Sequence, residues 1–259
     1  MKIARNARLY IGVVFVATLV AATMGTRAAQ HDQDKQMVNT MVQKKVAVCV
    51  GRLLVELPVD AEIRFSGARL GGIDINVESG YTPQKAASVI AEREASLVGK
   101  LNEYERPSLE KIVDAKAVNF QARLLYSARE KPVTRMSNGQ PVTSEEGITV
   151  EAFGIKDDLF YRFKGEGLSS PKYEKNVATL VEKFESRTTV SIPSGPGFCT
   201  ENGIVHDPIA PDMNETVTMF ASLKGHPDIA IRLDTSVLSN QTKFTVNSLP
   251  KPFIKDRIS

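Results

Sequence analysis

Two cysteines, Cys49 and Cys199, constrain this chain more than any other feature, because they are its only ones and lie far apart in the sequence. Cys49 lies within the apolar run "VAVCVGRLLVELP", and Cys199 follows a segment rich in proline and glycine. In an oxidising compartment, an even number of cysteines is typical of disulfide bonding. The sequence leaves two readings open: a Cys49–Cys199 disulfide, or two separately buried free thiols.

The first 28 residues favour the disulfide, because they have the pattern of a secretory signal peptide. Basic residues precede an uncharged apolar run over residues 9–24, and small residues surround a cleavage position after Ala28. The run is shorter than the roughly 20 residues that cross a bilayer. We therefore expect a signal peptide at residues 1–28 and a periplasmic product. The alternative is an inner-membrane anchor formed by residues 9–24.

Removal of this segment changes the charge of the protein. The whole chain has 33 Lys and Arg residues against 30 Asp and Glu residues, a formal net charge of +3. The segment contains basic residues and no acidic ones, namely Lys2, Arg5, Arg8 and Arg27. The mature protein is therefore close to neutral and lacks the basic surface that nucleic-acid binding requires. We expect no nucleic-acid partner.

Alternating apolar residues predict strands in most of the mature chain. Residues 29–43 are polar without a period and are expected to form a flexible lead-in. The run that contains Cys49 is expected to be one strand that ends at Pro58. Further strands are predicted around the Gly-rich turn of residues 61–79, as three or four strands between Leu109 and Gly165, and at "ETVTMFASL", "DIAIRLDTS" and "KFTVNS" near the C-terminus.

Two segments change to a helical period. Thr82 and Pro83 can cap and begin the first helix, and Ser170 and Pro171 the second. The apolar residues of the second segment recur at helical spacing, namely Tyr173, Val177, Leu180, Val181 and Phe184. We expect an α+β fold in which an antiparallel sheet carries the two helices on one face, followed by a smaller β-rich second domain.

The segment "SRTTVSIPSGPGFC" is the clearest candidate for a domain boundary, since two prolines and two glycines occur close together in it. We expect a first domain at residues 44–190, a linker at 191–202 and a partial second domain at 203–259. A unit of this size with one apolar face is marginal alone. It is therefore expected to pack on the first domain or to be incomplete.

The sequence shows no reaction centre. It lacks a G-x-S-x-G nucleophile elbow. Its three histidines, His31, His206 and His226, have no companions at metal-ligand spacing. A nucleophile pair of Cys199 and His206 would require a free thiol. We therefore expect no catalytic residue, no metal and no cofactor, as in a binding protein.

Several motifs resemble the periplasmic immunity proteins that neutralise the fourth family of type VI secretion lipase effectors. They are "VCVGRLLVELP", "GGIDINVES" and "GPGFCTENGIVHDP", followed by "VTMFASLKGHPDIAIRLDTS". The resemblance implies two related α+β domains that hold an exported phospholipase in a one-to-one complex and block its active site or lid. It implies no catalysis. The chain departs from the family in one way: it stops at Ser259, whereas the second domain of the family is typically larger.

Two other classes of function stay open. An exported lipid- or envelope-binding structural protein would hold an acyl chain in an apolar groove, and an exported hydrolase of unknown type would need a site that the sequence does not reveal. The partner-binding residues are unknown, because a binding loop and an ordinary solvated loop look alike. The candidates are the turns "RMSNGQPVTSEEG" and "TENGIVHDP".

Overall fold

The computed structural model describes residues 35–36, 44–209, 214–224 and 226–237. The predicted signal peptide, the anchor alternative at residues 9–24, His31 and the last predicted strand at residues 243–248 lie outside the described residues, as does most of the lead-in. Within the described ranges, no helix is long and apolar enough to cross a membrane.

The run around Cys49 forms two strands, so the prediction of one strand is wrong. Strands β1 (Lys45–Val50) and β2 (Leu53–Pro58) pair with each other. The chain reverses at Gly51, whose φ of 59° lies in the left-handed region that favours glycine. A Cβ at this position would lie 2.6 Å from Oγ1 of Thr235. Residues 44–46 and 57–59, at the open end of this hairpin, belong to a separate compact unit from the rest of the described chain.

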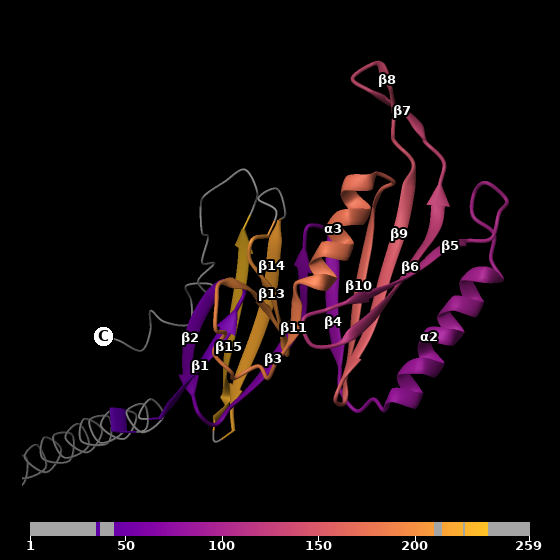
Figure 1. Ribbon diagram of the computed structural model, residues 1–259. Helices are drawn as coiled ribbons and strands as arrows, with labels where there is room; N and C mark the ends of the chain where they lie inside the picture. Colours follow the sequence, from indigo (N-terminus) through magenta and orange to yellow (C-terminus); the bar gives the residue numbers. More distant parts are fainter. Residues whose placement is uncertain (1–34, 37–43, 210–213, 225, 238–259) are drawn as a thin grey trace, which may run out of the picture. The chain divides into compact units, whose positions relative to one another are not determined.

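An eight-stranded sheet dominates the larger unit, and its paired strands are all antiparallel (Figure 1). Its strand order is β15-β14-β3-β4-β10-β9-β6-β5. The strands are β3 (Ala61–Leu70), β4 (Ile73–Glu78), β5 (Leu109–Lys116), β6 (Gln121–Glu130), β9 (Gly147–Lys156), β10 (Leu159–Leu168), β14 (Glu215–Leu223) and β15 (His226–Val237). The two strands predicted around the Gly-rich turn are β3 and β4.

Both helices begin at the predicted residues. Helix α2 (Pro83–Val98) starts after Thr82, whose hydroxyl accepts the N–H of Lys85 at 3.2 Å. Helix α3 (Pro171–Glu182) starts after Ser170, whose hydroxyl accepts the N–H of Tyr173 at 3.2 Å. Each cap satisfies a backbone donor that has no partner within the helix.

The two helices pack on opposite faces of the sheet, so the expectation that both lie on one face is wrong. The core side chains Ala86 and Leu97 of α2 cluster with Phe160. Phe160 lies in β10, and so does Gly165, which packs against Tyr173 of α3. A Cβ at Gly165 would lie 2.4 Å from the Tyr173 hydroxyl. Positions 160 and 165 of a regular strand point to opposite faces. The central strands are therefore covered on both sides, which explains their runs of consecutive buried residues.

An aromatic cluster fills the face that carries α3. Phe184, which was expected in the helix, lies just after it in strand β11 (Phe184–Ser186) and is fully buried. Its ring contacts those of Phe120, Tyr161 and Phe163 at centroid distances of 6.0, 5.1 and 5.0 Å. Edge-to-face packing of this kind adds to the hydrophobic stabilisation of a core.

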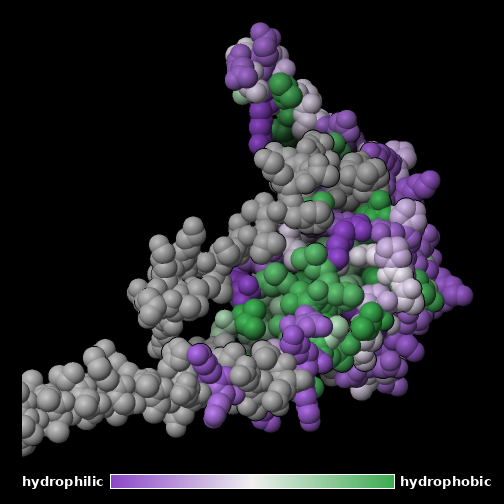
Figure 2. Space-filling view, turned by 90° about the vertical axis from the view of Figure 1, so that its left-hand side faces the viewer, coloured by the Kyte–Doolittle hydropathy of each residue, from purple (hydrophilic) through white to green (hydrophobic). Residues whose placement is uncertain are grey.

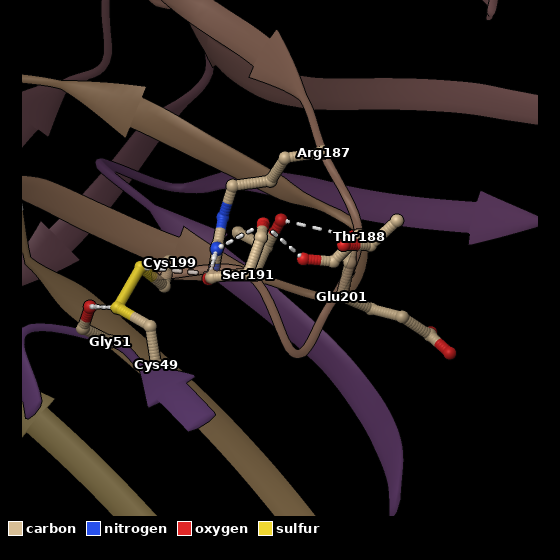
Figure 3. Close-up of a disulfide and its surroundings, with 8 residues drawn as sticks. Cys49, Gly51, Arg187, Thr188, Ser191, Cys199 and Glu201 are labelled. Carbon is tan, nitrogen blue, oxygen red and sulfur yellow. Dashed lines mark hydrogen bonds between the residues drawn. A yellow bond between two sulfur atoms is a disulfide. The ribbon is translucent and has the colours of Figure 1, made fainter. Parts of the chain in front are cut away.

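The predicted disulfide joins Cys49 to Cys199, so the alternative of two free thiols is wrong (Figure 3). Cys199 lies in β12 (Gly197–Thr200), which pairs with β13 (Gly203–His206), and β13 also pairs with β11. Gly51 and Cys199 exchange two backbone hydrogen bonds of 3.0 and 2.7 Å. The turn of the first hairpin is thus fixed to β12 by one covalent bond and two hydrogen bonds.

Arg52, the residue after Gly51, ties the same turn to β14. Its guanidinium donates to both carboxylate oxygens of Glu215, at 2.7 and 2.6 Å, and to those of Asp207, at 2.9 and 3.1 Å. Glu215 is buried, and removal of its cation would leave an uncompensated charge inside the protein. The hydrogen bonds from Arg52 also hold the pKa of Asp207 below its usual range.

The C-terminal strands continue the sheet that the N-terminal strands begin. Strand β14 pairs with β3 over nine positions, from Glu215 opposite Leu70 to Leu223 opposite Ala61. Within the predicted linker, residues 197–200 form β12. The domain boundaries at 190, 202 and 203 remain predictions, and any division has to accommodate a sheet that both sides share.

Replacement of both cysteines by alanine is expected to lower the free energy of unfolding. The disulfide spans 150 residues. In the chain-entropy model, a bridge over a loop of this length contributes up to about 5 kcal/mol. Chemical denaturation of the oxidised wild type and of the Cys49→Ala/Cys199→Ala variant measures the difference. Reductant should destabilise the wild type alone, and equal stability of the two oxidised proteins would contradict the prediction.

Candidate partner-binding surface

The first candidate turn is a β-hairpin, which we call the arm (residues 134–143). Strands β7 (Thr134–Ser137) and β8 (Gln140–Thr143) pair with each other and continue beyond the ends of β6 and β9 (Figure 1). Between them, Asn138 and Gly139 have φ values of 51° and 76°. Positive φ at both positions defines a type I′ turn, which matches the twist of a hairpin.

The arm exposes apolar side chains although it has its own regular structure. All ten of its residues are exposed, with Met136 at 70% and Val142 at 54%. Val133, which precedes it, is 48% exposed. The arm rises at the top of Figure 2, where hydrophobic residues are visible between hydrophilic ones. Exposed apolar side chains that gather on one element can mark an interaction site.

Polar contacts brace the base of the arm. The guanidinium of Arg129 donates to Glu110 at 2.7 Å and to Glu146 at 3.1 Å, and it also contacts Ser169. The hydroxyl of Tyr104 donates to Glu146 at 2.6 Å. The strands that enter and leave the arm are therefore held by β5 and by neighbouring loops, so that the arm has a defined position without belonging to the core.

These contacts shift the acid–base equilibria at the base of the arm. Hydrogen bonds from Tyr104 first and Arg129 second hold the pKa of Glu146 below its usual range. The same bond raises the pKa of the Tyr104 hydroxyl. The hydrogen bond to Glu110 is the largest cause that raises the pKa of Arg129. The shifts favour the charged carboxylates and guanidinium that form the brace.

The second candidate turn lies beside the disulfide. In "TENGIVHDP", residues 201 and 202 form the two-residue connection between β12 and β13. Asn202 has a φ of 49°, and its side-chain oxygen accepts the hydroxyl of Thr189 at 2.8 Å. Its backbone oxygen accepts the Tyr161 hydroxyl at 2.8 Å and the N–H of Arg187 at 3.0 Å. Asn202 therefore fixes this turn to three other parts of the chain.

Histidines and acids form no reactive cluster in the part of the chain that the structure describes. Nε2 of His206 lies 2.5 Å from Glu185, and Cys199 is in the disulfide, so the two do not form a nucleophile pair. His226 begins strand β15. Among the described residues, no group of three or more His, Cys, Asp or Glu side chains could hold a metal ion.

Solved structures share this antiparallel α+β fold. The apo immunity protein TplEi of the type VI secretion system from Pseudomonas aeruginosa is 20% identical, with a TM-score of 0.56, and the match covers 76% of this chain and 62% of that one. The Tle4-Tli4 complex matches at 21% identity and a TM-score of 0.56, over 79% of this chain and 62% of that one. TplEi complexed with an "L" peptide matches at 20% identity and a TM-score of 0.53, over 75% of this chain and 59% of that one. The chain thus has the fold of immunity proteins and spans about 60% of their length.

Sequence models then identify the family. The Tle cognate immunity protein 4 N-terminal domain matches residues 46–136, and the C-terminal domain of the same protein matches residues 191–246. Together they span more than half of the chain, in the expected order. The chain belongs to the Tle cognate immunity protein 4 family. No curated protein sequence matches it significantly.

Removal of the Tyr104 hydroxyl is expected to raise the pKa of Glu146 towards its ordinary value. The Tyr104→Phe variant loses the larger of the two hydrogen bonds that lower this pKa. Because the folded-state pKa is depressed, the stabilisation is present above the ordinary carboxyl pKa and is lost as the pH falls through the folded-state value. Carboxyl NMR titration of both proteins measures the shift, and an unchanged Glu146 pKa would refute this account of the brace.

Proposed function

We propose that this chain is a periplasmic immunity protein that binds a type VI secretion phospholipase effector and inhibits it in a one-to-one complex. The observation that carries the proposal is the match of both Tle cognate immunity protein 4 domains, in order, to one chain. One of the solved structures with the same fold is a complex of Tle4 with Tli4. The pattern of a signal peptide supports export of the chain to the compartment where such an effector would act.

Inhibition of this kind needs no catalytic residue in the inhibitor. A rigid surface that covers the entrance of the active site or holds its lid open or closed keeps lipid from reaching the nucleophile. A stable interface would bury on the order of 1,600 Å² in total, with a few side chains that contribute most of the affinity. The family match and the braced, exposed elements of the fold support this role over catalysis.

The arm is the part of the surface that we propose as a contact with the effector. Met136 and Val142 lie on a hairpin whose turn and base are fixed, so their positions are set before binding. Because the backbone that carries these anchors is preformed, association costs less conformational entropy than the ordering of a flexible loop would. In the folded chain alone, their exposure is unfavourable, and burial in a hydrophobic depression of a partner would remove it.

The neutralisation assay tests the proposed function. A candidate lipase effector, sought among the genes that neighbour this one, is produced in the periplasm of a Gram-negative host, with and without this chain. We expect the chain to restore growth, to suppress phospholipid cleavage and to purify with the lipase at one to one. Continued killing in the presence of the folded, exported chain would rule the proposal out. Stoichiometric lipid in the purified chain would instead favour the lipid-binding alternative.

Changes in the arm are expected to weaken the complex without unfolding the protein. The variant Met136→Gln/Val142→Thr removes two exposed apolar anchors, and we expect the dissociation constant to rise about tenfold or more. The matched control, Val118→Thr/Ile192→Gln, changes side chains that are 49% and 64% exposed elsewhere. Calorimetric titration with the lipase measures both. Equal affinities for the two variants would exclude the arm as an anchor.

A further inference from the structure

The sheet opens between β3 and β4. These strands pair at three positions only, from Ala68 opposite Ile75 to Leu70 opposite Ile73. Beyond them, β4 stays paired with β10, whereas β3 stays paired with β14. The register of β3 against β14 skips Ser66, and the neighbouring Gly67 has a φ of 125°. A β-bulge of this kind bends and twists a strand, which explains why β3 leaves β4 at this point.

A groove lies where the strands part. It consists of a hollow of about 110 Å³ and an adjoining, more open one of about 350 Å³, which share Ser66, Gly67, Ala68 and Asn76. Beyond the pair of Ala68 and Ile75, the lining residues 65–67 of β3 and 76–77 of β4 make no β3–β4 ladder pairs. Their backbone groups and the Asn76 amide therefore offer hydrogen-bond acceptors to a guest.

Among the described residues, Glu201 is the only ionisable side chain that lines the smaller hollow. It occupies the turn that Asn202 fixes, so its position is set by the scaffold. Figure 3 shows its carboxylate extending away from the disulfide and from Arg187. Burial raises the pKa of the Glu201 carboxyl group, and no charge among the described residues offsets this effect. In the adjoining hollow, Arg69 and Asp74 pair with each other at 3.5 Å.

A half-buried carboxylate on a fixed turn is unfavourable in the free protein, because it has lost hydration without gaining a cation. A guest cation would remove this penalty and form charge-assisted hydrogen bonds. One carboxylate provides too few ligands for Ca²⁺ or Mg²⁺, which require about six oxygen ligands. An ammonium or guanidinium group can instead use Glu201 together with neutral acceptors around it.

We propose that the groove between β3 and β4 receives a basic side chain, lysine or arginine, of the effector protein, with Glu201 as its counter-ion. The identity of the partner rests on the proposed function, whereas the preference for an organic cation rests on the groove itself. Because Asn202 holds the turn through Tyr161, Arg187 and Thr189, the site is formed before the partner arrives. A preorganised charge of this kind contributes to specificity as well as to affinity.

The first experiment tests the groove without the effector. Full-length wild type is titrated with N-acetyl-arginine methylamide to tens of millimolar, and amide NMR shifts are followed. The neutral isostere N-acetyl-citrulline methylamide serves as the ligand control. We expect saturable shifts at residues 66–68, 76 and 201–202 with the arginine compound only. Glu201→Gln should abolish them, and Glu62→Gln, which changes an exposed carboxylate on β3, should leave them intact.

Two results of this titration would overturn the proposal: absence of arginine-specific shifts at the groove, or equal shifts in wild type and Glu201→Gln. A second experiment measures affinity for the lipase, which Glu201→Gln should weaken about tenfold or more and Glu62→Gln should not. If wild type fails to bind the lipase although the titration succeeds, the proposed function is wrong and the cation site stands. If wild type binds and Glu201→Gln binds equally well, the effector does not use the groove and the proposal fails.

Discussion

The turn at Gly51 and Arg52 is the junction on which the larger unit depends. Its backbone and the neighbouring Cys49 are bonded to Cys199, while the Arg52 guanidinium holds the buried Glu215. One short turn therefore joins β12 and β14, which are remote from it in the sequence. The position tolerates no side chain, since a Cβ at residue 51 would collide with Thr235. Covalent, ionic and steric constraints coincide there.

The sequence predicted those parts of the fold that depend on local chemistry. Thr82 and Ser170 could be predicted as helix caps, because a hydroxyl residue directly before a proline is a signal that depends on adjacent residues only. The side of the sheet on which each helix packs could not be predicted. The periodicity of apolar residues shows which face of a helix is buried, but it does not show which face of the sheet covers it. The arm was missed as a hairpin because its short strands are fully exposed and show no alternation, although Asn138-Gly139 is a strong type I′ signal.

The candidate sites depend on contacts between distant residues, so the sequence could point only to the segments that contain them. Both turns singled out as candidates proved to be ordered hairpins, but nothing in "TENG" indicates that Glu201 faces a groove. That property arises from a bulge in β3, about 135 residues earlier. The disulfide could be predicted from the sequence alone, since two cysteines in a chain with the pattern of a signal peptide leave a single possible intramolecular pair.

The pairing of β3 with β14 has a consequence for the order of folding. Residues 61–70 find their neighbour only when residues 215–223 are available, whereas β5, β6, β9 and β10 join by consecutive hairpins. Contacts of such long range form slowly, because the entropy of closing a large loop opposes them. An emerging chain would therefore complete the β6–β9–β10 region first and keep one edge of β3 open, which is the state most prone to aggregate.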